Sequence, residues 1–140
     1  MPLFLRSLLF SLLILAATAC TKKKEPEPTP QLEGTWTVQY TETTFFNADG
    51  VVLVHSPSAP PVEPTTYLFT PSDYTVTVGS RPYLYTYTRE QTIIHSQYAA
   101  GGIGSKLDLL IKTLTQSELL LEYSYSAGAG YNRIVIHLAR

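Results

Sequence analysis

From Glu33 to Arg140, short segments with alternating apolar and polar residues are separated by turn residues, and none keeps a helical period. The segments are rich in Thr, Tyr, Val, Ile and Leu, which suit a pleated surface with one buried face. The pattern therefore predicts an all-β domain of about eight to nine strands. The predicted strands lie at residues 35–46, 51–55, 66–70, 74–79, 83–88, 92–98, 106–113, 119–126 and 131–138.

The turns between these segments are mostly short, which favours antiparallel neighbours in an up-and-down order. The tight turn Thr70-Pro71-Ser72-Asp73 predicts a hairpin that places Phe69 opposite Tyr74 and Tyr67 opposite Val76. A sheet of many short strands must protect its edge strands, and closure into a barrel leaves no free edge. A barrel of about eight strands is either filled by side chains or holds one small ligand.

Aromatic residues gather on single faces of three predicted strands. Tyr83, Tyr85 and Tyr87 share one face, Tyr123 and Tyr125 extend the face of Leu121, and Tyr67 shares a face with Phe69. If these faces point inward, they are candidate lining residues for an apolar or amphipathic ligand. The same stripes are expected of a filled core or of an exposed aromatic contact surface, and the sequence leaves these interpretations open.

The first 19 residues have the parts of an export signal. Arg6 precedes an apolar stretch at 8–17, which is too short to span a membrane, and small residues lead up to Cys20, the chain's single cysteine. The segment Ala17-Thr18-Ala19-Cys20 resembles a bacterial lipobox. That resemblance implies cleavage before Cys20 and lipid chains such as palmitate on it, which anchor the protein stably.

A soluble exported protein with a free thiol is the alternative, although such a thiol is exposed to oxidation. Residues 20–31, rich in Pro, Lys and Glu, are expected to be a tether. Lys22, Lys23 and Lys24 either meet anionic headgroups or form a solvated charge run.

Other chemistry has little support in the residues. The formal net charge is −1, which does not suit nucleic acid. His55, His95 and His137 have no partner at metal-ligand spacing on one strand, and no serine lies in a G-x-S-x-G turn. We therefore expect neither an enzyme nor a metal or cofactor site.

The start of the predicted domain, Gln31-Leu32-Glu33-Gly34-Thr35-Trp36, resembles the G-x-W motif that opens lipocalin-like barrels. The segments 109–121 and 134–140 resemble the last hairpin and last strand of small bacterial lipocalin-like lipoproteins. The resemblance implies that Gly34 and Trp36 lie at the closed end of the barrel, under an arginine for which Arg133 or Arg140 is the candidate. Alternation alone places Trp36, Val38 and Tyr40 on one face and makes Trp36 a core residue.

These observations predict a signal peptide at 1–19, a lipidated cysteine with a tether at 20–31 and a lipocalin-like barrel at 32–140. The expected protein is anchored in a bacterial cell envelope, in the outer membrane, and binds a small hydrophobic or amphipathic molecule. The rival hypothesis is an interaction or structural module with a filled core. Its contact surface would be an exposed sheet face or the Pro-rich stretch 55–64, which is either a lid or an inert excursion.

Overall fold

The structure, a computed structural model, describes residues 29–57, 60–101 and 106–140. The predicted signal segment, Cys20 and most of the tether lie outside these residues. The described part contains nine β-strands. They are β1 (Gly34–Asn47), β2 (Val52–Pro57), β3 (Thr65–Phe69), β4 (Asp73–Val78), β5 (Arg81–Glu90), β6 (Ile93–Tyr98), β7 (Lys106–Leu114), β8 (Glu118–Ala127) and β9 (Gly130–Ala139).

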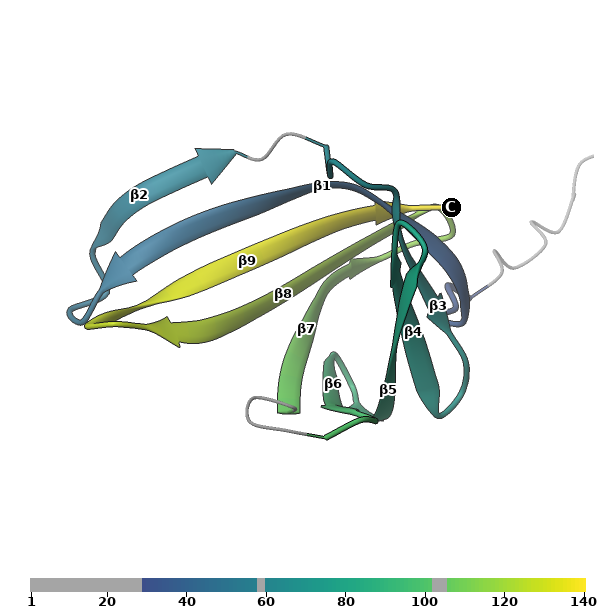
Figure 1. Cartoon of the computed structure of the whole chain (residues 1–140). Coiled ribbons are helices and arrows are strands. Elements are labelled where there is room, and N and C mark those ends of the chain that lie inside the picture. The colour runs from purple at the N-terminus through teal and green to yellow at the C-terminus, as the bar shows by residue number, and fades with distance from the viewer. Residues whose placement is uncertain (1–28, 58–59, 102–105) are drawn as a thin grey trace, which may run out of the picture.

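All neighbouring strands are antiparallel, in the order β2-β1-β3-β4-β5-β6-β7-β8-β9, and β1 also pairs with β9. The β1–β9 pairing closes β1 and β3–β9 into a barrel, and β2 is an extra strand on β1. In Figure 1, β3 to β7 stand below one end of the long strands β1, β8 and β9. The predicted all-β, up-and-down antiparallel barrel is confirmed.

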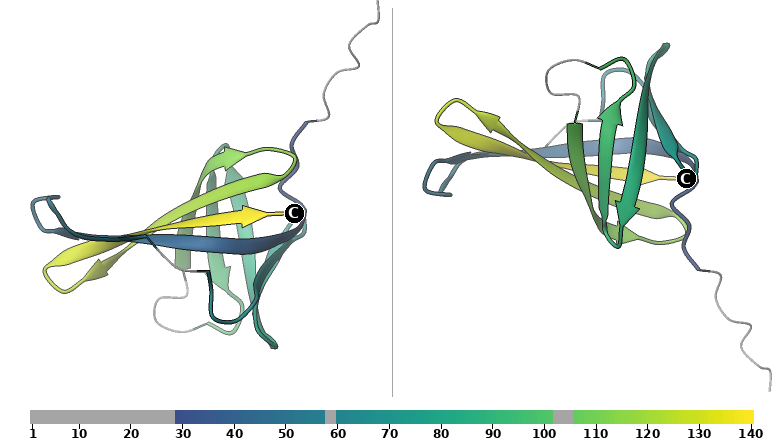
Figure 2. Two further views of the ribbon diagram at one scale, coloured as in Figure 1. Left: turned by 90° about the horizontal axis from the view of Figure 1, so that it is seen from above. Right: turned by 90° about the horizontal axis from the view of Figure 1, so that it is seen from below.

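Three long strands run out of the barrel wall and form an arm. β1 pairs with β3 only over residues 34–37 and with β2 over residues 42–46. On the other side, the pairing of β7 with β8 does not extend beyond Leu110 and Glu122. Figure 2 shows the resulting projection beyond the β4–β7 layer. We call this part the arm: β2 with residues 42–47 of β1, 122–127 of β8 and 130–135 of β9.

The hairpin of β3 and β4 has the register that its turn predicts. Phe69 lies opposite Tyr74, and Tyr67 lies opposite Val76. Thr70 holds the turn, because its backbone N–H and its hydroxyl both donate to the Asp73 carbonyl. Turn length and hydrophobic pattern therefore fix this register together.

One predicted face is wrong in β1. The strand register shifts between Val38 and Tyr40, so Gln39 is an extra residue in the ladder with β9. Trp36 and Val38 point into the barrel, whereas Tyr40 is turned outward and its ring stacks on His137 with centroids 4.0 Å apart. Alternation cannot foresee this shift because a bulge reverses the side-chain period.

The core lies inside the barrel and is concentrated at the end where β1 begins and β9 ends. Its largest fully buried side chains are Trp36, Tyr74, Phe69, Leu32, Ile94, Leu109, Leu119 and Leu121. Neither face of the arm is covered by a second layer of described residues (Figure 1). The described residues contain no helix of the length and apolar character needed to cross a membrane.

Candidate functional site

The predicted lining residues lie at different depths, and Tyr125 alone among them lies on the arm. Phe69 and Leu121 are 2% and 0% exposed and belong to the packed base. Tyr67, Tyr85 and Tyr123 are partly accessible although they pack against the core. We call these three residues, from β3, β5 and β8, the tyrosine tier.

The remaining predicted residues lie at the margins of this tier. Tyr83 is partly accessible and packs against Tyr98 with ring centroids 6.4 Å apart. Tyr87 donates its hydroxyl to the Thr70 carbonyl at 2.7 Å, close to the base. Tyr125 lies on the arm and is 49% exposed.

Two rings of the tier, Tyr67 and Tyr85, belong to a continuous group of packed aromatic rings. Tyr74 is stacked on Tyr85 with centroids 4.8 Å apart and an interplanar angle of 5°. Phe69 lies 5.0 Å from Tyr74 on its other side, and Tyr67 contacts both rings at 6.1–6.2 Å. Offset and tilted ring pairs of this kind stabilise a fixed arrangement. The floor of the tier is therefore a preformed aromatic surface.

Burial makes the tyrosine tier hard to ionise. Desolvation raises the pKa of Tyr67 and Tyr74 far above the usual value near 10, and it raises those of Tyr85 and Tyr123 as well. Repulsion from the phenols of Tyr74, Tyr123 and Tyr85 adds to the shift at Tyr67. Phenols from four strands thus converge on one region, and at neutral pH they present hydroxyl groups as donors and acceptors.

The closed base is held by the residues of the G-x-W segment. Trp36 is fully buried and donates its indole N–H to the Leu32 carbonyl at 2.7 Å. The guanidinium of Arg140 lies 3.9 Å above the Trp36 ring, and it donates to the Gln31 carbonyl. Gly34 has φ +115°, and a Cβ there would lie 3.6 Å from Arg140. Gly34 and Trp36 therefore lie together at one end of the barrel.

Of the two candidate arginines, Arg140 lies over Trp36. Arg133, the other candidate, lies instead over Phe46 on the arm, with its guanidinium carbon 4.9 Å from the ring. The reason is the path of β9, because Arg133 pairs with Thr44 where β1 has already left the barrel. The expectation for Arg133 is corrected accordingly.

A lateral hollow of about 500 Å³ opens where β7 and β8 diverge. It is lined by Lys106, Leu107, Asp108 and Ser124. Leu107 also packs against the buried core, and Ser124 follows Tyr123 on β8. This hollow therefore brings solvent to the wall of the barrel beside the tyrosine tier.

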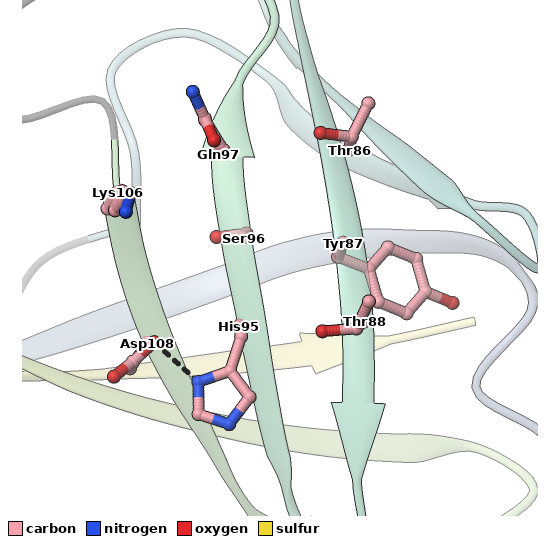
Figure 3. A pocket seen from close by; sticks show the side chains of 8 residues that line it. All are labelled: Thr86, Tyr87, Thr88, His95, Ser96, Gln97, Lys106 and Asp108. Carbon is pink, nitrogen blue, oxygen red and sulfur yellow. Dashed lines mark hydrogen bonds and ion pairs between the residues drawn. The ribbon is translucent and has the colours of Figure 1, made fainter.

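A second hollow, of about 440 Å³, lies over β5, β6 and β7 (Figure 3). Its lining residues are Thr86, Tyr87, Thr88, His95, Ser96, Gln97, Lys106 and Asp108. His95 Nδ1 lies 2.8 Å from Asp108 Oδ1, and His95 Nε2 lies 4.0 Å from Glu90 Oε2. These three side chains are well exposed, so water screens their charges.

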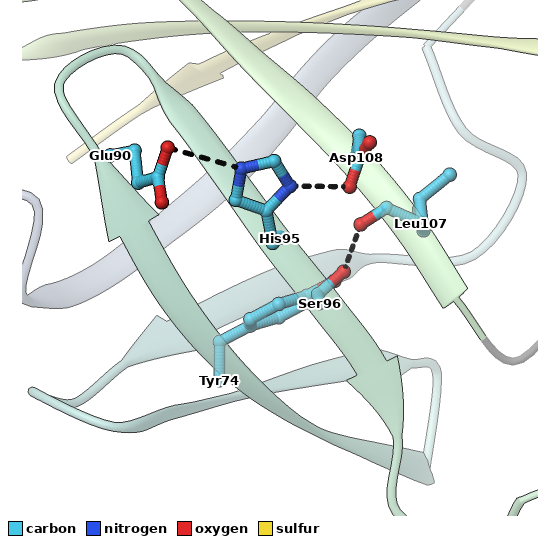
Figure 4. Close-up of polar contacts among 6 residues, drawn as sticks. All are labelled: Tyr74, Glu90, His95, Ser96, Leu107 and Asp108. Atoms are coloured by element: carbon cyan, nitrogen blue, oxygen red, sulfur yellow. Dashed lines mark hydrogen bonds and ion pairs between the residues drawn. The ribbon is translucent and has the colours of Figure 1, made fainter.

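The order His95-Ser96 suggests a nucleophile and base, but the two side chains serve different faces (Figure 4). Tyr74 donates to Ser96 Oγ at 3.0 Å from the barrel interior, and Ser96 donates to the Leu107 carbonyl at 2.6 Å. His95 instead contacts Asp108 outside. The described residues therefore supply no serine–histidine pair here, and they contain no cluster of three or more potential metal ligands.

Some residues of the site were not singled out from the sequence. Tyr74 follows directly from the hairpin register, because it lies opposite Phe69. Leu107 and Tyr98 alternate correctly on β7 and β6, but an isolated leucine or tyrosine carries no signal of its own. The opening between β7 and β8 has no local signal, because it depends on where two distant strands separate.

No protein-family model and no curated protein sequence matches the chain. Among solved structures, it is similar to the crystal structure of a lipocalin-like protein from Bacteroides uniformis ATCC 8492. The sequence identity is 13%, the match covers 78% of this chain and 97% of that chain, and the TM-score is 0.49.

Proposed function

We propose that this protein binds a small hydrophobic or amphipathic molecule in the tyrosine tier. The observation that carries the proposal is the position of Tyr67, which is both packed and accessible. Its ring packs against Phe69, Tyr74 and the buried core, yet part of the side chain is accessible. An aromatic ring that packs on the core and is still partly accessible offers apolar surface to a small ligand.

Binding would bury apolar ligand surface against the aromatic floor. We infer that the ligand enters at the lateral hollow beside Leu107, where the pairing of β7 with β8 has ended, and that the phenol hydroxyls orient its polar groups. Most of the free energy of binding comes from apolar burial, because hydrogen bonds from neutral phenols mainly fix the orientation of the ligand.

Native mass spectrometry of the full chain, together with titration by a fluorescent fatty acid, tests this function. Tyr85→Ala and Tyr123→Ala remove rings from the tier and are expected to weaken binding at least about tenfold, equivalent to about 1.4 kcal/mol. Tyr131→Ala is the matched control, because Tyr131 is a partly exposed tyrosine on the arm that stacks on Phe46. Wild-type protein with no co-purifying ligand and no probe uptake would disprove the function.

We further propose that lipid chains on Cys20 anchor this protein in the outer membrane of a bacterial cell envelope. The support is the lipobox-like segment and the uncharged run before it. Wild-type cells fed an alkyne analogue of palmitate should label the protein, and Cys20→Ser should abolish the label. Density-gradient fractionation then separates inner-membrane from outer-membrane material, and wild-type protein found only in the soluble fraction would contradict anchoring.

The second candidate function is an interaction module. The stacked rings of Phe69, Tyr74 and Tyr85 fill much of the barrel, which favours a core without a ligand. Exposed apolar residues on β2 offer a contact surface instead. The same mass measurement discriminates the two, since an interaction module carries no excess mass.

A further inference from the structure

The free edge of β2 is a feature of the described fold that the ligand-binding function does not use. β2 forms a ladder with β1 alone and stands at the end of the strand order. The backbone N–H and C=O groups on its other side therefore have no partner strand among the described residues. An open edge of this kind is a template for another strand.

The composition of β2 does not protect this edge. Proteins commonly place charged residues on edge strands, but Val52–Pro57 reads VLVHSP and contains no Lys, Arg, Asp or Glu. Val51, Val52, Leu53 and Val54 are 51–56% exposed. Pro57 ends the usable ladder, because it has no N–H to donate.

Both faces beside the edge carry apolar side chains at the Val52–Val54 end of β2. Val54 pairs with Phe45 on one face, and Val52 pairs with Phe46 on the other. Phe46 in turn stacks on Tyr131 with centroids 4.7 Å apart. A strand laid along β2 would cover apolar surface on both faces while it pairs the backbone.

The unpaired backbone and the exposed apolar side chains of β2 together favour an extended strand over a lipid bilayer as the partner. A lipid bilayer would cover the valines but leave the backbone groups unpaired in hydrocarbon, which is costly. An extended strand satisfies both needs. A second β2 is suited to the position because two uncharged strands meet without the repulsion that like charges opposite one another produce.

Among the described residues, the arm has a second edge without a partner strand, on residues 123–127 of β8, where tyrosine and serine alternate. Pairing β2 of one copy with this β8 edge of another would be head-to-tail and would propagate, whereas β2 with β2 closes by two-fold symmetry. The run of consecutive exposed apolar residues is on β2, so pairing there removes more apolar surface from water.

We propose that β2 pairs antiparallel with β2 of a second copy of this chain, joining two arms into one continuous sheet. This interface is independent of the tyrosine tier. It adds a contact between copies to the ligand-binding function and does not rest on it.

The test uses the full chain, co-expressed with two different affinity tags and extracted in mild detergent. We expect the two tagged forms to co-purify, and Val54→Lys to reduce co-purification at least tenfold by placing two ammonium groups at the interface. Leu84→Lys is the matched control: Leu84 is 46% exposed on β5, which is paired on both sides, so this variant should co-purify like the wild type. Failure of the wild-type forms to co-purify, or equal co-purification of Val54→Lys, would overturn the proposal.

A second measurement does not depend on weakening the interface. In Val54→Cys, mild oxidation should give a disulfide-linked dimer, whereas Leu84→Cys and the wild type, whose single cysteine is Cys20, should stay monomeric on a denaturing gel. A dimer that forms equally in Leu84→Cys would indicate random collision and contradict the interface. Long filaments in place of dimers would show β2–β8 pairing and would likewise overturn the proposal.

Discussion

At the scale of single residues, Arg140 joins two distant parts of the chain. Its guanidinium lies over the buried Trp36 ring and donates to the Gln31 carbonyl. A cation above an aromatic face is attracted by the negative potential of the ring, and more so when water is excluded. Arg140 therefore covers the base of the barrel, where the predicted N-terminal tether ends at Gln31.

Arg140→Ala is expected to lower the free energy of unfolding by about 1–2 kcal/mol, because the variant loses both the ring contact and the hydrogen bond. Urea denaturation followed by Trp36 fluorescence measures this loss. Arg81→Ala is the control: Arg81 is exposed on β5, so the change should be within about 0.5 kcal/mol. Equal losses in the two variants would show that the base contact is not stabilising.

The tyrosines predict a sensitivity to alkaline pH. Burial raises the pKa of Tyr67 and Tyr74 in the fold, whereas the unfolded chain ionises near pH 10. Above that pH the folded state binds more protons than the unfolded state, so the free energy of unfolding falls as pH rises. The expected slope is about 1.4 kcal/mol per pH unit for each tyrosine that stays neutral in the fold.

Absorbance at 295 nm, which reports phenolate, tests this expectation between pH 9 and 12 at about 25 °C. Some tyrosines of the folded protein should ionise only when the chain unfolds, and Tyr67→Phe should reduce their number by one. Complete ionisation of the native protein near pH 10 would refute the deep placement of Tyr67.

At the scale of elements, the arm depends on the close approach of β1 and β9. Gly130 begins β9 opposite Asn47, and a Cβ at Gly130 would lie 2.0 Å from the backbone carbonyl oxygen of Phe46. Backbone cannot move aside as a flexible side chain does. Glycine is therefore required here for steric reasons.

Gly130→Ala is expected to destabilise the protein by about 1–3 kcal/mol, the usual cost of forcing atoms into a packed site. The damage should concentrate in the arm, where amides of β1 and β9 should exchange faster with deuterium. Ser126→Ala, at an exposed position of β8 in the arm, is the control and should exchange like the wild type. Unchanged exchange and stability in Gly130→Ala would mean that the strands can separate there at no cost.

The sequence predicts the single strands better than the places where distant strands pair and separate. Most strands have their own alternating pattern, and a short turn fixes the register of Phe69 against Tyr74, because both signals are local. The bulge at Gln39 reverses the face of Tyr40 and is invisible to alternation. The placement of Arg140 rather than Arg133 over Trp36, and the opening beside Leu107, depend on where distant strands pair and separate.

At the scale of the whole molecule, the barrel and the arm differ in how much of their sheet surface packs against other residues. The barrel half of β9, with Ile136 and Leu138 buried, packs on the core. Its arm half, residues 130–135, is paired with β1 and β8 but has no second layer of described residues over either face. Both halves of β9 pair with β1 and β8, and the register shift at Gln39 interrupts the β1 ladder in the barrel half, so greater stability of the barrel half reports packing and not more regular hydrogen bonding.

Native-state hydrogen exchange resolved along β9 should show this difference. Amides of residues 136–138 are expected to exchange only on global unfolding, and those of residues 131–133 by local opening of the arm, roughly 100-fold faster, equivalent to about 2.7 kcal/mol. Both halves lie on one strand between the same two neighbours, so each serves as the control for the other. Equal exchange rates would mean that arm and barrel unfold as one unit, and that the arm is stabilised by something other than the packing of a single protomer.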